Sequence, residues 1–417
     1  MRAFLEFHII QNFAPSNLNR DDTGAPKDAI FGGHRRARVS SQCFKRATRL
    51  AAAEYDLIDE SHRGIRTKRL KRLLIERLID RDPEEAAGKI ESALAAAGLS
   101  LSKKDSEKTE YLLFLGEKEI AGFAELVDQH WDDLVDVDAT TTKKQRKAAA
   151  PPEVTKKAKA LLDGGKAVDI ALFGRMLADL PAVNQDAACQ VAHAISTHRV
   201  EREFDYYTAV DDRGLEDDTG ADMIGQIEFN SATFYRYAVL DINKLLDNLQ
   251  GDRELALSAI EAFATAFVRA VPTGKQNTFA AHNAPDFIGV SLRHVAPMSL
   301  ANAFEKPVKL GIAVICRIFA ARADLAVRTV EEKEEIFRIW VIGIPTPQED
   351  LVVAVAHFSL KAVVVSTADD EMNTQLEKLL SEPVQPGAIV RPGCNGIKIQ
   401  NQSFPRQPVN PTRVASL

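Results

Sequence analysis

The sequence predicts an α+β fold in which a long helical segment interrupts a domain of strands and helices. Three observations lead to this prediction. The chain opens on an apolar, β-like segment, and residues 60–165 are rich in Ala, Leu and charged residues. Aromatic residues then alternate with polar ones from Glu203 to Tyr237, which indicates a long hairpin. The resulting order is strand, helix, helical insertion, hairpin, helix and strand.

The first 55 residues are expected to form a strand, a loop and a helix. Ala3 to Gln11 is rich in Phe and Ile, which favours a strand. Pro15 to Gly33 is polar and rich in turn-forming residues, so we expect a loop. Ser40 and Ser41 are good N-cap residues for a helix that continues to about Tyr55.

The segment from about 60 to 165 is expected to be a helical insertion because leucines recur there with helical spacing, as at Leu70, Leu74 and Leu78. Its stretch Arg63 to Arg72 holds six Lys/Arg residues and no acid. A second cationic run, residues 143–147, leads into Ala148-Ala149-Ala150-Pro151-Pro152, a composition typical of an exposed, mobile loop.

Beyond the insertion, residues 166–200 are expected to be helical, and the hairpin that follows has a polar centre from Asp211 to Gly225. Leu255 to Val271 is predicted as an amphipathic helix and Val290 to Leu292 as a strand. This order fits an α+β domain of the ferredoxin-like or RNA-recognition class, interrupted by insertions. No K/R-G-F-G-F run identifies the module from pattern alone.

Composition is that of an ordinary globular protein long enough, at 417 residues, for two or more domains. No apolar run approaches the length of a membrane span, and the N-terminal segment is too short and polar for a signal peptide. Four scattered cysteines, Cys43, Cys189, Cys316 and Cys394, form no zinc-binding spacing. We therefore expect no membrane partner, a cytoplasmic location and reduced thiols.

Charge is distributed unevenly along the chain. The formal net charge is −6, yet residues 1–50 hold nine Lys/Arg residues against four acids. On a helix, Gln42, Lys45, Arg46 and Arg49 share one face, whereas Phe44, Ala47, Leu50 and Ala51 lie largely on the other. A cationic face at a helix N-terminus favours an anion such as a phosphate. A solvated amphipathic helix is an equally good interpretation of the charges alone.

Enzyme motifs are missing from the sequence, which contains no G-x-x-x-x-G-K-[ST], H-E-x-x-H or G-x-S-x-G. His193 and His198 are five apart and do not share a helix face, so core or supporting roles are favoured. The pairs Asp21-Asp22 and Asp211-Asp212 could hold Mg²⁺, but capping or ion pairing with nearby arginines is the better interpretation. We expect no catalytic residue, no metal and no cofactor.

Several blocks, in their order and spacing, resemble CasC, the repeated backbone subunit of the type I-E CRISPR surveillance complex called Cascade. In the N-terminal region the resemblance rests on Leu18–Asp22, Lys27–Gly33 and Arg38–Arg49. Downstream it rests on Val168–Leu172 with Gly174–Met176, Ala192–His198, Tyr207–Asp212, Phe234–Tyr237, Gly274–Ala281 and Met298–Lys306. It covers roughly residues 1–308, with a loose match from about 55 to 165.

The resemblance implies a hand-shaped subunit with a modified RNA-recognition (ferredoxin-like) palm, helical fingers and a β-hairpin thumb. The palm would comprise residues 1–54, 166–203 and 232–417, the last with a divergent tail, the fingers 55–165 and the thumb 204–231. Several copies would line up along the spacer part of a guide RNA, each thumb reaching over its neighbour and kinking the guide. The exposed bases would then pair with target DNA. Implied partners are guide RNA, target DNA, further copies of the chain and other Cascade subunits.

The resemblance and the basic face together predict the RNA-binding residues. Arg20, Lys45, Arg46, Arg49 and Lys275 would bind phosphate, and Ser40, Ser41 and Gln42 would hydrogen-bond to phosphate or the 2′-OH. Tyr206 and Tyr207 are stacking candidates, but neighbouring strand residues face opposite sides, so one of the two is expected to be structural. The predicted set is completed by Lys27, Met176, for which a buried gap-filling role is the alternative, and Gln276.

Two matters stay open at this stage. The rival function is an RNA-processing or nuclease enzyme on the same kind of fold, for which His8 and His34 are the nearby candidate bases; a single-stranded nucleic-acid binder acting alone is a third. The resemblance also fades after about Lys309, where four β-like runs occur before a Pro/Arg/Asn-rich end from Pro383. These runs are Ile312 to Phe319, Ile336 to Ile344, Leu351 to Phe358 and Lys361 to Val365.

Overall fold

A computed structural model describes residues 2–308 except 103, 136–149, 164, 178–179, 209–223 and 295, together with three short strands at 338–341, 389–393 and 396–400. The chain divides into two compact units, Met1–Leu360 and Lys361–Leu417. The first contains the elements discussed below, and the second contains a pair of antiparallel strands.

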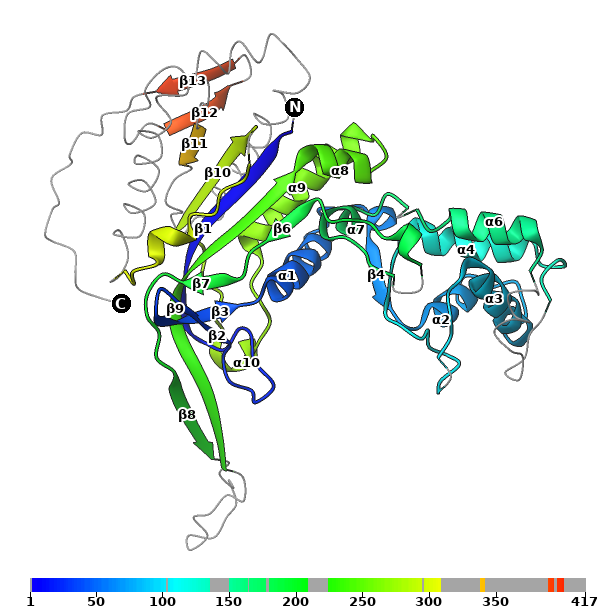
Figure 1. Cartoon of the computed structure of the whole chain (residues 1–417), viewed down its shortest axis with the longest axis horizontal. Coiled ribbons are helices and arrows are strands. Elements are labelled where there is room, and N and C mark those ends of the chain that lie inside the picture. The colour runs from blue at the N-terminus through cyan, green and yellow to red at the C-terminus, as the bar shows by residue number, and fades with distance from the viewer. Residues whose placement is uncertain are drawn as a thin grey trace, which may run out of the picture. The chain divides into compact units, whose positions relative to one another are not determined.

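An antiparallel sheet organises the first unit (Figure 1). Its strands follow the order β11-β10-β1-β9-β7-β3-β2, and β6 and β8 also pair with β9. The strands are β1 (Phe4–Ser16), β2 (Asp28–Phe31), β3 (His34–Val39), β6 (Cys189–Val191), β7 (Ala194–Ser196), β8 (Glu203–Thr208), β9 (Ile224–Asp241), β10 (Phe287–Arg293) and β11 (Arg338–Val341). Together with the helices, this sheet confirms the predicted mixture of helices and strands.

The core forms where two helices cover the central strands. Strand β1 lies between β9 and β10, so that Phe7 is opposite both Ala238 and Val290. The Phe7 ring meets Phe263 edge-on at 5.4 Å, and Phe263 belongs to helix α9 (Arg253–Arg269). Helix α1 (Ser41–Glu54) packs beside α9 through small side chains, namely Ala47, Ala51, Ala266 and Ala270. Small residues let the two helix backbones approach closely, which fixes the outer face of α1 relative to the sheet.

A helical insertion with its own core separates α1 from α7 (Val168–Phe173) (Figure 1). Leu74, Ile90, Phe123 and Val127 are almost fully buried in it. Its helices are α2 (Leu70–Ile75), α3 (Pro83–Ala97), α4 (Glu117–Gln129) and α6 (Pro152–Ala160), with a 3₁₀ turn η1 (Glu60–His62) before them. The strand pair β4 (Gly64–Thr67) and β5 (Leu113–Gly116) also belongs to it and was not expected.

The prediction of helix over residues 166–200 is wrong beyond Phe173. Helix α7 ends at Gly174, whose φ is +78° and where a Cβ would lie 2.9 Å from the backbone of Gln185 and Ala187. The chain then passes through the 3₁₀ turn η2 (Pro181–Val183) into β6 and β7. Both strands add to β9, so hydrogen bonding to an existing sheet overrides local helix propensity here.

The loop predicted over 15–33 is partly wrong as well. Strand β1 continues to Ser16, and Asp28–Phe31 pairs with His34–Val39. Gly32 and Gly33 form the two-residue turn with φ of +58° and +76°, which only glycine adopts without strain. Leu50 is another difference, since 37% of it is exposed although a core position was expected.

The remaining elements are α8 (Ile242–Asn248), α10 (Gln276–Phe279) and η3 (Ala301–Phe304). The expected helix from 255 to 271 and the expected strand near 290 correspond to α9 and β10. Strand β11 lies inside the expected run 336–344; the runs at 312–319, 351–358 and 361–365 lie outside the described residues. In the second unit, β12 (Ile389–Gly393) pairs with β13 (Gly396–Gln400), where no strand was predicted. Among the helices that are described, none is long and apolar enough to cross a bilayer.

Candidate nucleic-acid interface

The loop after β1, which carries Arg20 and Lys27, is held directly against the N-terminus of α1. Asn19 makes both connections: its Oδ1 accepts from the Ser40 backbone N–H at 2.9 Å, and its carbonyl accepts from the Lys27 N–H at 2.9 Å. Two predicted ligands, Arg20 and Lys27, therefore lie next to the first turn of α1. In the described part of the chain, neither has a carboxylate within ion-pair distance.

Asp21 stabilises the fold of this loop. Its Oδ1 accepts from the Thr23 hydroxyl at 2.7 Å and from the Thr23 and Ala25 N–H groups at 2.9 and 3.0 Å. The hydrogen bond from the Thr23 hydroxyl, followed by those from the backbone, lowers the pKa of Asp21. This carboxylate caps its own turn, as the sequence suggested. Asp211 and Asp212 lie outside the described residues.

The first turn of α1 holds no acidic side chain. Ser40 is the N-cap; it is 6% exposed and its Oγ accepts from the Cys43 N–H at 3.3 Å. Capping thus occupies Ser40, which was expected to contact RNA. Ser41 and Gln42 are the accessible polar side chains of this turn, beside unpaired backbone N–H groups that attract anions.

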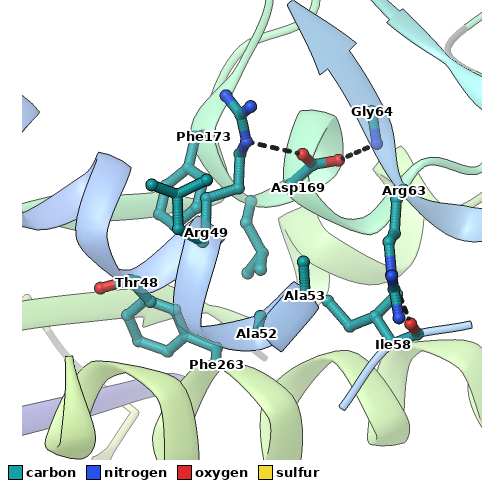
Figure 2. A pocket seen from close by; sticks show the side chains of 12 residues that line it. Thr48, Arg49, Ala52, Ala53, Ile58, Arg63, Gly64, Asp169, Phe173 and Phe263 are labelled. Carbon is teal, nitrogen blue, oxygen red and sulfur yellow. Dashed lines mark hydrogen bonds and ion pairs between the residues drawn. The ribbon is translucent and has the colours of Figure 1, made fainter. Parts of the chain in front are cut away.

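The cations on this face of α1 differ in exposure and in whether they form an ion pair. Arg46 is exposed and Lys45 is half-buried, and neither has an ion-pair partner among the described residues. Lys45 Nζ lies 5.8 Å from the centre of the Phe173 ring. Arg49, predicted as a phosphate ligand, instead pairs through Nε with Asp169 Oδ2 at 3.3 Å, and its side chain is 21% exposed (Figure 2).

Asp169 joins α1 to the helical insertion. Its Oδ1 accepts from the Gly64 N–H at 2.7 Å while its Oδ2 faces Arg49 (Figure 2). Burial raises the pKa of Asp169 to about 6, although Arg49 and the Gly64 N–H both favour the ionised form. A small cavity of about 100 Å³ lies beside this junction and is lined by Ala52, Ile58 and Phe263 among others.

Near this junction lies Arg66, a cation that was not among the residues predicted to bind RNA. Arg66 lies over the Phe114 ring at 4.5 Å, and Arg49 lies over the same ring at 5.2 Å. Arg46 and Arg66 both lower the pKa of Arg49, although burial is the largest cause of that shift. Two guanidinium groups, those of Arg49 and Arg66, thus act on the buried carboxylate of Asp169, and the exposed Arg46 lies within electrostatic range of Arg49. The signal was the acid-free run Arg63–Arg72, but only the pairing of β4 with β5 shows which of its members reaches α1.

The turn that carries Lys275 and Gln276 packs on the same loop. A Cβ at Gly274 would lie 2.3 Å from the Leu18 carbonyl oxygen, so only glycine permits this approach. Lys275 follows with a left-handed φ of +51°. Gln276 Nε2 donates to the Pro272 carbonyl at 2.9 Å and so holds its own turn together. Lys275 is therefore placed beside the loop bearing Arg20, whereas Gln276 has a structural bond.

The hairpin separates its two tyrosines. Tyr207 packs on Gly225, where a Cβ would lie 2.1 Å from the tyrosine Cζ. Tyr206 is on the opposite face and is 64% exposed, together with Phe204 at 59%. Tyr207, at 42% exposed, is thus the member of the pair that packs on the hairpin itself, and Tyr206 is the more accessible one. The hairpin tip at 209–223 lies outside the described residues.

Met176 is 81% exposed, which excludes the buried role left open for it. The residue before it, Arg175, is buried and fixes the segment through Glu119, with Nη1 2.7 and 2.8 Å from the two carboxylate oxygens. Its Nη2 also donates to the Leu162 and Val183 carbonyls. A rigid support therefore presents an apolar side chain to the surface.

The two candidate bases, His8 and His34, lie in different surroundings. His8 is 3% exposed, and its Nδ1 lies 2.8 Å from the Tyr235 hydroxyl. His34 is exposed at the β2–β3 turn, and His193 Nδ1 lies 3.2 Å from Arg38 Nη1. Within the residues that the structure describes, no group of three or more His, Cys, Asp or Glu side chains is arranged to hold a metal ion.

Comparison with known proteins gives a matching family and related solved structures. The family model described as CT1975-like protein matches residues 5–326. A chain from a solved "CRISPR RNA-guided surveillance complex, pre-nicking" has 30% sequence identity and a TM-score of 0.69, with 86% of this chain and 99% of that chain covered. A chain from a "CRISPR RNA-guided surveillance complex" has 26% identity and a TM-score of 0.62 over the same shares. No curated protein matches the chain.

Proposed function

The chain belongs to the CT1975-like protein family, and we propose that it is a guide-RNA-binding scaffold subunit of a CRISPR surveillance complex. The observation that supports this most directly is the convergence of three separate segments. The loop with Arg20 and Lys27, the first turn of α1 and the turn with Lys275 are packed on one another through Asn19 and Gly274. Their cations have no carboxylate partners among the described residues, so a phosphate backbone is the ligand that suits them.

In more detail, we propose a type I-E backbone subunit of the CasC kind. The four strands β10-β1-β9-β7 with α1 and α9 have the order of a βαββαβ unit, which supports the modified RNA-recognition palm. The helical insertion would be the fingers and the β8–β9 hairpin the thumb. Copies of the chain would polymerise along the spacer region and present its bases to target DNA, in company with other Cascade subunits.

The RNA contacts follow from accessibility. Arg20, Lys27, Arg46 and Lys275 would bind phosphates. Lys45, and Arg66, which was not among the residues predicted from the sequence, would lie beside the path of the RNA backbone. Ser41 and Gln42 would hydrogen-bond to phosphate or the 2′-OH. Tyr206 would stack on a base, and Met176 would contact the guide as an apolar wedge. Because these contacts address the backbone, binding should be largely independent of guide sequence.

Reconstitution on guide RNA tests this function. The chain, expressed with guide RNA and assembled, should protect the spacer region from nuclease with a regular period, one interval per copy. Tyr206→Ala should remove the periodic contrast, which is the regular alternation of protected and cleaved positions along the spacer. Tyr207→Phe keeps the ring on Gly225 and should retain this alternation. Uniform protection without period, or protection confined to one RNA sequence, would contradict the scaffold function.

We further propose that the subunit is not catalytic. Incubation of the purified chain with guide precursor in Mg²⁺ or in EDTA should leave the RNA intact. Cleavage that disappears in His34→Ala would instead favour the RNA-processing alternative, since His34 is exposed and was one of the two candidate bases.

A further inference from the structure

The β8–β9 hairpin needs a firm root if it is to act on RNA. All six residues of β8 are exposed, and β9 is the partner strand of β8 among the described residues. An isolated two-stranded hairpin is at best marginally stable in water. Strand β9 joins the wider sheet only from Asn230, opposite Ser16. The direction of the hairpin must therefore be set by contacts just before that point.

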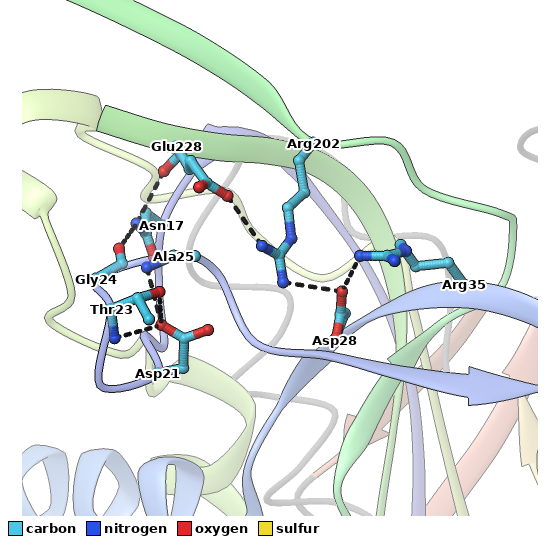
Figure 3. A network of polar contacts seen from close by, with 9 residues as sticks. All are labelled: Asn17, Asp21, Thr23, Gly24, Ala25, Asp28, Arg35, Arg202 and Glu228. Carbon is cyan, nitrogen blue, oxygen red and sulfur yellow. Dashed lines mark hydrogen bonds and ion pairs between the residues drawn. The ribbon is translucent and has the colours of Figure 1, made fainter. Parts of the chain in front are cut away.

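Arg202, the residue before β8, makes such contacts on both sides (Figure 3). Its Nη1 lies 3.0 Å from Glu228 Oε2 on β9, and its Nη2 lies 3.0 Å from Asp28 Oδ2 on β2. One planar guanidinium thus joins both arms of the hairpin to a neighbouring strand, a geometry that lysine cannot reproduce. Arg35 Nη1 holds the same Asp28 oxygen at 2.7 Å and fixes the carboxylate in place.

Two further contacts tie the root to the phosphate-binding segments. Asn17 Nδ2 donates to the Glu228 carbonyl at 2.9 Å and to the Gly24 carbonyl at 3.0 Å, which links β9 to the Arg20 loop (Figure 3). On the other face of β9, Phe229 meets Phe279 at 5.5 Å. Phe279 belongs to α10, which begins directly after Lys275. The root is therefore bound to each segment that carries predicted phosphate ligands at Arg20, Lys27 or Lys275.

The carboxylates already occupy Arg202. Both ends of its guanidinium fork face acidic oxygens, and its side chain is 27% exposed. It is accordingly a poor phosphate ligand but well suited to fixing an angle. We propose that Arg202 is the positioning residue of the hairpin, which holds Tyr206 in register with the loop bearing Arg20 and Lys27. This inference rests on the proposed guide-binding function.

The test separates positioning from RNA binding and from folding. Arg202→Ala should assemble on guide RNA but lose the periodic contrast of nuclease protection, as Tyr206→Ala does. Combining the two changes should add no further loss, because both act through the same contact. The slope of log affinity against log salt should equal that of the wild type. Arg199→Ala is the matched control, since Arg199 pairs with Glu201 at 2.9 Å on an exposed surface, and it should behave as wild type throughout.

Each opposing result has a distinct meaning. A wild-type footprint in Arg202→Ala would overturn the positioning role, as would a salt slope shallower by about 0.7, which marks a direct phosphate contact. If Arg202→Ala does not fold, Asp28→Asn is the second variant, because it keeps a hydrogen-bond acceptor on β2 but removes the charge that pairs with Arg202. It should reduce the periodic contrast of nuclease protection in the same way. An unchanged protection pattern in Asp28→Asn also overturns the proposal. A wild-type chain without periodic protection would instead contradict the proposed function itself.

Discussion

Two of the cationic runs of this chain, the first Asn19–Arg49 and the second Arg63–Arg72, are both rich in Lys and Arg but divide their charges differently. In the first run, Arg36 is fully buried and donates to the carbonyls of Ser196, Phe304 and Glu305. Arg35 and Arg49 have carboxylate partners in Asp28 and Asp169. Arg38 donates to the Asp28 carbonyl and contacts His193. Arg20, Lys27, Lys45 and Arg46 also have no carboxylate partner among the described residues, and they lie around the N-terminus of α1.

The second run uses half of its cations inside the helical insertion. Lys71 is buried between Glu91 and Glu107, Arg63 pairs with Asp56, and Arg72 pairs with Glu76. Arg66, Lys68 and Arg69 are exposed without an ion pair in the described part of the chain. Charge density alone therefore does not identify a binding surface. The acids that other segments bring to each cation decide whether it stabilises the fold or stays available.

Removing the buried cation of the second run should have the largest effect. Lys71→Met leaves Glu91 and Glu107 without the ammonium they share at 3.0 and 2.9 Å. Loss of one partner of a buried pair costs about 3–5 kcal/mol in the free energy of unfolding, measured by urea denaturation. Arg72→Met is the control, because its pair with Glu76 is exposed and is worth about 0.5 kcal/mol or less. Equal losses in the two variants would mean that burial does not distinguish these cations.

The runs meet at Asp169, where pH gives the next largest effect. Burial raises its pKa from 3.8 to about 6 in the folded chain. Between these values the folded state holds a proton that the unfolded state has released, so the free energy of unfolding should fall as pH rises from 4 to 6. The contribution is at most about 3 kcal/mol. Asp169→Asn should remove this component, seen as unfolding midpoints that differ from the wild type by a pH-dependent amount. A constant difference from pH 4 to 7 would show that Asp169 does not titrate there.

Much of the fold was accessible from the sequence because its signals are local. The apolar run of β1, the Ser40 cap of α1 and the amphipathic pattern of α9 each follow from a short segment. The short strands β6 and β7 could not be predicted in this way. They exist because β9 offers unpaired backbone groups to them, and the paired residues of β9, from Phe234 to Leu240, lie much further along the chain.

In the candidate site, too, local features could be predicted from the sequence and contacts between distant segments could not. Spacing on a helix correctly placed Gln42 and Arg46 on the exposed face of α1 and Phe44 and Ala47 in the core. It could not show that Asp169 would reach Arg49, or that Arg66 would lie over the same ring as Arg49. Nor could it choose between Tyr206 and Tyr207, since strand alternation separates two faces without saying which is covered. The contact of Tyr207 with Gly225 leaves Tyr207 42% exposed against 64% for Tyr206, so Tyr206 is the more accessible of the two.

Within the first run, the available cations should govern binding of guide RNA. Lys45→Ala combined with Arg46→Ala should make the slope of log affinity against log salt shallower by about 1.4, at about 0.7 for each phosphate contact on a single strand. The loss should be similar for guides of different sequence. Lys156→Ala with Lys159→Ala removes the same charge from exposed positions on α6 and should leave the slope unchanged. If the two double variants change the slope equally, the overall electrostatic field of the protein, rather than a binding site on α1, causes the change.

The smallest effect addresses whether the second run also contributes. Arg66→Ala should make the slope shallower by about 0.7, the effect of one contact, because its guanidinium lies beside the α1 face over Phe114. Arg72→Ala should leave it unchanged, although both residues come from the same acid-free run and both are exposed. The difference between them is the carboxylate of Glu76, 2.7 Å from Arg72 Nε. If Arg66→Ala and Arg72→Ala reduce the slope by the same amount, the presence of a carboxylate partner does not decide whether a cation binds RNA. The proposed difference between paired and unpaired cations would then be wrong for the two most similar residues.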